Sequence, residues 1–353
     1  MIRIHTIDAH AAGEPLRLIV SGFPSVKGRT ILEQRAYVRK RYDHLRRALM
    51  LEPRGHADMY GALLTPPERE DSHAGVLFMH NEGYSTMCGH GVIAVTTIAV
   101  ERNLIVVPRE ADGSVRLTLD SPAGPIHVVA KTAVAQGFSP AGIGVAQGFS
   151  PAGTRVTGVT FRNVPSFVLH PSLTVRAGHR DIRADVAFGG AFYAIVDSEA
   201  VGIPIVPERL PDLRRIGMEI KQAVEKAVRV EHPLEPQLKG IYGTIFTGPP
   251  SGADADLRNV TIFADAQVDR SPCGTGTAAV MAVLAAMGML VAPGQIFRHE
   301  SIIGTTFRGR VAGETKVGEL DAIIPEIEGE AFITGESTFL IDDDDPLRDG
   351  FRI

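Results

Sequence analysis

Short runs of alternating or continuous apolar residues recur along most of the chain, and they predict a structure in which strands outnumber helices. Residues 2–8 alternate between apolar and polar positions, and the apolar run 16–20 follows after a Gly-Glu-Pro turn, which indicates neighbouring strands. Similar runs predict further strands at 59–64, 74–80, 115–119, 126–130, 156–161, 167–170, 240–247 and 260–263. Short strands are expected to fill the remainder up to residue 340.

Four longer segments have helical character. Residues 30–50 and 210–230 combine apolar positions with a charged stripe, as in helices that bury one face. Residues 87–102 and 271–290 each begin with a Gly-rich turn and continue as an almost wholly apolar helix. Two such turn–helix units far apart in the sequence predict two α/β halves of related design, each with strands wrapped around one apolar helix.

Length and composition are those of a globular protein with about two domains. The chain has 353 residues, of which 44% are apolar and 22% charged, and its formal net charge is −5. The negative balance argues against a nucleic-acid or membrane-surface role, and the basic run 35–47 is interpreted as a solvated helix face. The expected partner is a small-molecule substrate, and base rates favour a homodimer.

No segment resembles a targeting signal or a membrane span. The first residues lack a basic flank followed by an apolar core, and the longest apolar run, 277–292, is shorter than the roughly 20 residues that a spanning helix needs. The cytoplasm is therefore the expected location.

A nine-letter segment, VAQGFSPAG, occurs at 134–142 and again at 145–153. Its Gly, Pro and Ser content predicts a surface loop lengthened by a tandem duplication, without a catalytic role. A repeat this short, present twice, does not indicate a solenoid.

The two cysteines of the chain lie in similar contexts. Cys88 lies in Met-Cys-Gly-His-Gly and Cys273 in Ser-Pro-Cys-Gly-Thr-Gly-Thr, each at the start of an apolar helix. A helix N-terminus carries unpaired N–H groups and partial positive charge, and glycines let a ligand approach the backbone. Each turn therefore predicts an anion site that suits a carboxylate, next to a thiol whose pKa the helix field lowers.

If the two turns face each other, they hold one carboxylate between two helix ends and place a thiol on each face of the adjacent carbon. One thiolate would remove the α-proton and the opposite thiol would deliver a proton. Such a 1,1-proton transfer requires neither a pyridoxal lysine nor a metal, so no cofactor is expected.

Other interpretations of the cysteines are weaker. A lone buried cysteine is usually inert packing, but two cysteines in matching glycine turns favour function. Two cysteines alone provide neither a disulfide framework nor a structural zinc site, and a cytosolic disulfide is uncommon. The phosphate-loop pattern and the papain-type signatures are absent.

The two motifs and several longer stretches resemble the proline racemase family. The resemblance runs through nearly the whole chain, including IDAHAAGEPLRLI, LEPRGHADMYGALL, NEGYSTMCGHG, NVPSFVL, DRSPCGTGT and FITGESTFLIDDDDPLRDGF. It implies a diaminopimelate-epimerase-like fold of the mixed α/β (α+β) class, with two pseudo-symmetric domains and the substrate between them. The expected boundaries are 1–124 plus 336–353 for the first domain and 125–335 for the second.

The resemblance also implies roles for individual residues. Cys88 and Cys273 match the acid/base pair, and His90 and Asp269 match the groups that hold the ring nitrogen. The residues that match the two carboxylate-binding turns are Gly89, His90, Gly91, Gly274, Thr275 and Gly276. No role follows for His56 or Asp58, and lining of the pocket by Phe167 or Tyr84 stays open.

The family includes proline racemases, 4-hydroxyproline 2-epimerases and trans-3-hydroxy-L-proline dehydratases. Family dehydratases usually carry Thr at the second cysteine position, because elimination needs only one base, so Cys273 favours a two-base isomerase. The expected activity is 4-hydroxyproline 2-epimerase, an isomerase. The alternatives are the dehydratase, a hydro-lyase, then proline racemase and, more remotely, a non-catalytic amino-acid binding protein.

Overall fold

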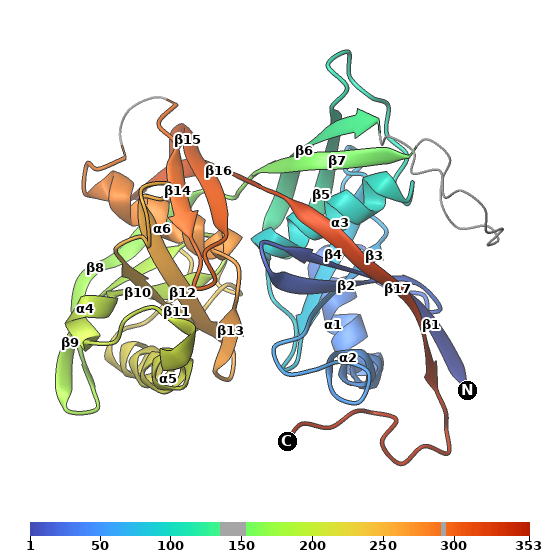
Figure 1. Ribbon diagram of the computed structural model, residues 1–353, viewed down its shortest axis with the longest axis horizontal. Coiled ribbons are helices and arrows are strands. Elements are labelled where there is room, and N and C mark those ends of the chain that lie inside the picture. Colours follow the sequence, from blue (N-terminus) through green and yellow to red (C-terminus); the bar gives the residue numbers. More distant parts are fainter. Residues whose placement is uncertain (135–152, 291–293) are drawn as a thin grey trace.

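Two lobes lie side by side, and each wraps its strands around one central helix (Figure 1). The structure, a computed structural model, describes residues 1–134, 153–290 and 294–353. The central helices are α3 (Gly89–Glu101) and α6 (Gly274–Ala286), and both are buried along most of their length. A helix that is apolar all round must be covered on every side, which explains why strands enclose each one. The predicted pair of strand-wrapped helices is confirmed.

The first lobe is built from neighbouring chain segments and closed by the last long strand of the chain. Strand β1 pairs antiparallel with both β2 and β17, so the two ends of the sequence meet in one sheet. Strand β3 runs parallel to β2 and antiparallel to β4. The elements are β1 (Ile2–Ala11), β2 (Glu14–Ser21), α1 (Ile31–Arg41), α2 (Asp43–Met50), β3 (Tyr60–Thr65), β4 (Ala74–His80), β5 (Val115–Ser121), β6 (Gly124–Val134), β7 (Thr154–Arg162) and β17 (Ala331–Ile341).

The second lobe repeats this pairing scheme. Strand β11 runs parallel to β10 and antiparallel to β12, as β3 does between β2 and β4. The elements are β8 (Ser166–Ala177), β9 (Arg180–Phe188), β10 (Phe192–Asp197), α4 (Ser198–Val201), η1 (Pro207–Arg209), α5 (Leu210–Ala227), β11 (Ile241–Gly248), β12 (Leu257–Phe263), β13 (Gln267–Asp269), β14 (Phe297–Glu300), β15 (Thr306–Val317) and β16 (Leu320–Gly329).

The equivalence of β3 and β11 extends to their residues. Both strands have the sequence Tyr-Gly-x-x-x-Thr, starting at Tyr60 and at Tyr242. Gly61 pairs with Arg17 on β2, and Gly243 pairs with Tyr193 on β10 in the corresponding register. The two tyrosines are therefore pseudo-symmetry mates, and the active-site geometry below depends on both.

Strand β16 joins the lobes, because it pairs with β7 of the first and β8 of the second. Strands β6 and β7 continue the sheet of β5, and β17 pairs with β1 from Ala331 onwards. The sequence places the boundaries at 124/125 and 335/336; from these pairings we propose instead that the first lobe comprises 1–163 and 330–353.

The prediction of one helix over 30–50 is wrong, because the chain breaks at Tyr42 into α1 and α2. Basic residues 39–41 end α1 and Asp43 begins α2, and each charge favours the helix end that it occupies.

The duplicated segment lies, apart from its first and last residues, outside the described residues. None of the helices in the described part of the chain is long and apolar enough to cross a membrane.

Candidate active site

The two cysteines begin the two central helices in matching fashion. Cys88 is the N-cap of α3 and its sulfur accepts a hydrogen bond from the Gly91 N–H at 3.3 Å. Cys273 is the N-cap of α6 and its sulfur accepts one from the Gly276 N–H, also at 3.3 Å. Cys273 adopts φ of +62°, a conformation that costs a non-glycine residue about 1 kcal/mol or more and is often retained at functional sites.

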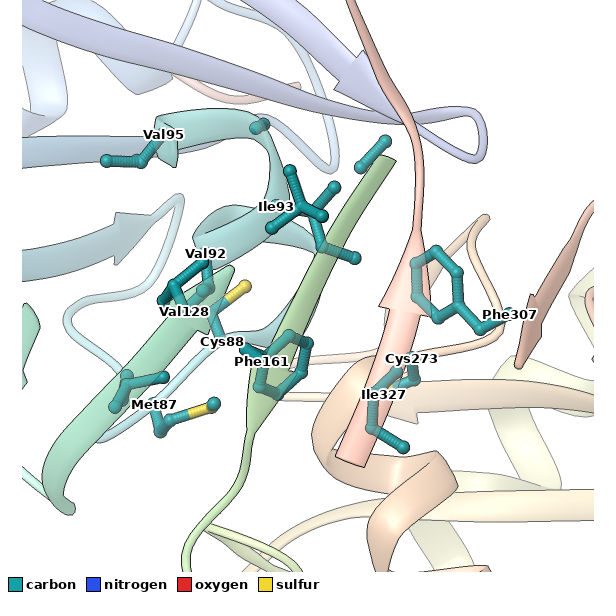
Figure 2. Close-up of a cluster of buried hydrophobic side chains, with 14 of the residues drawn as sticks. Met87, Cys88, Val92, Ile93, Val95, Val128, Phe161, Cys273, Phe307 and Ile327 are labelled. Atoms are coloured by element: carbon teal, nitrogen blue, oxygen red, sulfur yellow. The ribbon is translucent and has the colours of Figure 1, made fainter. Parts of the chain in front are cut away.

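The first glycine of each motif lets the two helices meet. A Cβ added to Gly274 would lie 2.5 Å from the Cα of Gly89, and one added to Gly89 would lie 2.4 Å from the Cα of Gly274. The two turns are thus in direct backbone contact. The ring of Phe161, labelled with Cys88 and Cys273 in Figure 2, would lie 3.0 Å from a Cβ on Gly89 and 3.2 Å from one on Gly274. The prediction that the two turns face each other matches this geometry.

The second glycine of each motif makes room for the sulfur. A Cβ on Gly91 would lie 3.0 Å from the Cys88 Sγ, and a Cβ on Gly276 would lie 3.0 Å from the Cys273 Sγ. A Cβ there would also lie 2.5 Å from the Phe78 ring or 2.9 Å from the Ile245 side chain. The spacing Cys-Gly-X-Gly therefore has a physical reason, since one glycine permits contact between the helices and the other leaves room for the sulfur and for this apolar neighbour.

A histidine and a tyrosine adjoin Cys88. The His90 Nδ1 lies 3.2 Å from the Cys88 Sγ and 3.8 Å from a carboxylate oxygen of Asp269, which belongs to the other lobe. The ring of Tyr60 meets His90 edge to face at 4.7 Å, and its hydroxyl bonds Ser85. Tyr60 and Cys88 line the same small cavity. His90 thus connects the thiol of one lobe to the carboxylate of the other.

The surroundings of Cys273 are similar in kind. The hydroxyl of Tyr193 lies 3.7 Å from the Cys273 Sγ and hydrogen-bonds the Thr275 hydroxyl at 2.6 Å. The Thr275 hydroxyl is itself 3.8 Å from the sulfur. Each thiol therefore lies beside the X residue of its Cys-Gly-X-Gly motif, which is His90 for Cys88 and Thr275 for Cys273. Each also has a tyrosine nearby in the lining of the cavity.

The space between the motifs is small, with a cavity volume of about 10 Å³, room for a single water molecule. Its lining residues are Tyr60, Met87, Cys88, Gly89, His90, Tyr193, Tyr242, Phe263, Asp269, Cys273, Gly274 and Thr275. A larger cleft of about 620 Å³ adjoins it, and Tyr242 lines both. A cavity of this volume has no room for a five-membered ring, so the site must widen before a substrate binds.

Burial controls the ionisation of the thiols. Burial, followed by the negative charge of Asp269, raises the pKa of the Cys88 thiol well above its ordinary value. The same two causes raise the pKa of Cys273 to about 12. The sequence analysis expected a lowered pKa at these helix starts. That expectation is wrong, because the N–H bonds from Gly91 and Gly276 lower the pKa by less than desolvation raises it.

Burial favours the neutral form of His90. Burial lowers its pKa, and the nearby Asp269 only partly offsets that effect. A neutral imidazole has one donor and one acceptor nitrogen, so His90 can donate to the thiolate or to the carboxylate or accept from the thiol.

The structure brings together every site residue that the sequence analysis named. Gly91 and Gly276 lie behind the sulfurs, and the other seven line the small cavity. Of the open candidates, Phe167 packs against Phe188 away from the cavity, and Tyr84 lines the larger cleft. The sequence analysis missed the lining residues Tyr60, Met87, Tyr193, Tyr242 and Phe263. The repeated Tyr-Gly-x-x-x-Thr was the one signal that could have found two of them.

Comparison with known proteins establishes the family. The model of the proline racemase family matches residues 6–352, and the chain belongs to this family of enzymes. It is 47% identical to trans-3-hydroxy-L-proline dehydratase of Bacillus thuringiensis subsp. konkukian, over 99% of this chain and 97% of the relative. It is 39% identical to proline racemase of Acetoanaerobium sticklandii, over 99% of this chain and 98% of the relative.

A solved structure of similar architecture agrees with this assignment. A hydroxyproline epimerase from Agrobacterium vitis, solved with bound trans-4-hydroxy-L-proline, superposes with a TM-score of 0.86 at 30% identity and covers 100% of this chain and 95% of its own. The expected diaminopimelate-epimerase-like fold is confirmed. The similar proteins comprise isomerases and a hydro-lyase.

Proposed function

We propose that the protein moves protons at the α-carbon of a hydroxyproline through Cys88 and Cys273, without a cofactor, and that it is a 4-hydroxyproline 2-epimerase. The observation that carries this proposal is the matched pair of cysteine-capped helix starts in direct contact through Gly89 and Gly274. Because both sulfurs cap a helix start in the same way, each thiol can take or give a proton.

In the proposed reaction one cysteine, as thiolate, takes the α-proton and becomes a thiol, while the C–H electron pair moves toward the substrate carboxylate. The N–H groups at the starts of α3 and α6 stabilise the charge that develops there. The opposite thiol then delivers its proton to the other face and becomes a thiolate. The configuration inverts, and the two cysteines exchange protonation states.

Asp269 has a double role in this proposal. Its carboxylate and the His90 ring are the polar groups available to the substrate nitrogen, and a secondary ammonium beside Asp269 forms a charge-assisted hydrogen bond. The same ammonium offsets the negative charge that raises the pKa of both thiols. Substrate binding thus favours the thiolate that the reaction needs.

The polar lining of the small cavity supports a hydroxylated ring as the substrate. Hydroxyls of three tyrosines and of Thr275 line the small space, and a ring hydroxyl can bond to them. The Tyr60 and Tyr193 hydroxyls already bond Ser85 and Thr275. A ring hydroxyl can join these hydrogen bonds, whereas the apolar ring of proline cannot.

A second candidate is dehydration of trans-3-hydroxy-L-proline, because the relative at 47% identity bears that name. One thiolate would take the α-proton and the electron pair would form the Cα–Cβ double bond. The 3-hydroxyl would leave as water with a proton from a cysteine thiol, and the resulting enamine would tautomerise to the imine. Chromatography of products from trans-4-hydroxy-L-proline, trans-3-hydroxy-L-proline and L-proline tests both candidates. The cis-4-hydroxy-D epimer as the preferred product supports our proposal, and a dehydrated imine from the 3-hydroxy substrate alone supports the second candidate.

A further inference from the structure

Charged residues outside the small cavity connect the two lobes beside it. Asp58, on the loop before β3, is buried, and its Oδ2 accepts a hydrogen bond from the Arg214 Nη2 of α5 at 2.5 Å. Its Oδ1 accepts one from the Val268 N–H on β13 at 3.3 Å. Asp58 adopts φ of +61°, a conformation that Asp tolerates better than most residues. A first-lobe carboxylate thus holds both a helix and a strand of the second lobe.

A second carboxylate of the first lobe makes a similar contact. Glu14, at the start of β2, is fully buried, and its Oε2 accepts bonds from the Arg270 N–H at 2.8 Å and from the Arg270 Nη1 at 3.3 Å. The same Nη1 donates to the backbone carbonyl of Asp58 at 3.2 Å. The Arg270 Nη2 also lies 3.8 Å from the Asp58 Oδ2, so the two carboxylates share Arg270 as a partner.

All these contacts converge on a short segment of the second lobe. Arg214 also donates to the carbonyl of Ala266 at 2.9 Å, so the bonded positions run from Ala266 to Arg270. That segment contains Asp269 and leads directly into the turn of Cys273. Whatever fixes it relative to the first lobe also fixes the carboxylate and the second thiol relative to Cys88.

We infer that Asp58, Glu14, Arg214 and Arg270 form an interlobe latch that holds the lobes closed over the substrate and positions Asp269 and Cys273. The inference rests on the proposed function, since a closed cavity must open to admit a substrate. Asp58 is a positioning residue in this account, because it contacts the latch partners and does not line the cavity.

The charged character of the latch suits a reversible closure. A buried ion pair gains Coulomb energy but costs desolvation of both charges, so its net contribution to closure is small. When the lobes part, water solvates the separated charges. Removing one partner alone is different, because the remaining charge is then buried without its counter-charge and the closed state becomes unfavourable.

The test measures how often the lobes open. Both cysteines are buried in the closed form, so the rate at which iodoacetamide alkylates them without substrate reports the open fraction. We expect Asp58→Asn and Arg214→Gln each to raise the alkylation rate of Cys88 and Cys273 about tenfold, measured by peptide mass spectrometry. The double variant should be no faster than the single ones, because both remove the same interaction.

The control is Asp8→Asn. Asp8 also pairs with an arginine, Arg17, but both residues belong to the first lobe. The two cysteines of this variant should therefore be alkylated at the wild-type rate. Steady-state kinetics gives a second measure: Asp58→Asn should raise KM about tenfold and change kcat less than about threefold, since saturating substrate restores closure.

Wild-type alkylation rates in both Asp58→Asn and Arg214→Gln would overturn the latch, as would an equal increase in Asp8→Asn. Since alkylation needs no substrate, this outcome is separable from failure of the proposed function. An enzyme that inverts hydroxyproline while these variants behave as wild type would lack the latch and keep the activity.

Discussion

Gly89 and Gly274 touch across the interface between the lobes, so that a Cβ on either one would lie within 2.5 Å of the Cα of the other. This contact brings the N-termini of α3 and α6 together, and both thiols line the small cavity between them. The chemistry proposed for the site depends on that approach, because neither helix start alone can serve both faces of a carbon atom.

Gly274→Ala should therefore separate the helix starts and lower kcat/KM by about a hundredfold or more, since misplacement by about 1 Å can cost that much. The neighbour is backbone and cannot move aside as a flexible side chain can. Gly252→Ala is the matched control, because nothing lies within 4 Å of the added Cβ. An active Gly274→Ala enzyme with unchanged thermal stability would contradict the close contact.

The two cysteines should be separable by reaction type. Cys88→Ser and Cys273→Ser should each nearly abolish epimerisation, because inversion needs a base on one face and an acid on the other. Elimination needs one base only, so Cys273→Ser should retain any activity on trans-3-hydroxy-L-proline. Full epimerisation in either variant, measured by chiral chromatography, would exclude the two-thiol mechanism.

Asp269→Asn should make the thiols more acidic and the enzyme less active. The Asp269 charge raises the pKa of both cysteines, so its removal should move the pH profile of alkylation by iodoacetamide to lower pH. The kcat/KM should fall about a hundredfold, because the substrate ammonium loses its counter-charge. Asp265→Asn, a change at a largely exposed carboxylate, serves as the control. An unmoved alkylation profile would show that Asp269 does not act on the thiols.

Acid should destabilise the fold partly through His299. Burial lowers the pKa of this histidine to about 3, and its Nδ1 bonds the Thr277 hydroxyl of α6 at 2.9 Å. A group whose pKa is lowered in the folded state contributes stability that is present above about pH 6.5 and lost as pH falls toward 3. His299→Gln should flatten the decline of Tm across this window, while the exposed His127→Gln should not. Equal slopes in both variants would argue against this role.

Much of the site was predictable because it is local in sequence. The Cys-Gly-X-Gly motifs specify their own caps, and the apolar helices that follow specify burial, so Cys88 and Cys273 and their turns could be recognised without a structure. Asp269 precedes the second motif by four positions and came with the family resemblance.

What the sequence could not give depends on long-range packing. The raised pKa of the thiols results from burial by both lobes, which a reading based on the helix start alone does not include. The role inferred for Asp58 depends on Arg214, which lies 156 positions away in the chain. The break at Tyr42 was missed for a different reason, because apolar and charged positions continue through it at helical spacing.

Proton NMR of the reduced enzyme with trans-4-hydroxy-L-proline in heavy water tests the two-thiol inversion most directly. Two separate thiols predict that early product, the cis-4-hydroxy-D epimer, carries deuterium at the α-carbon while the remaining substrate keeps its α-hydrogen. The product thus takes its hydrogen from one thiol while the other holds the proton removed. Early loss of the α-hydrogen from unconverted substrate, or no epimer at all, would contradict the account.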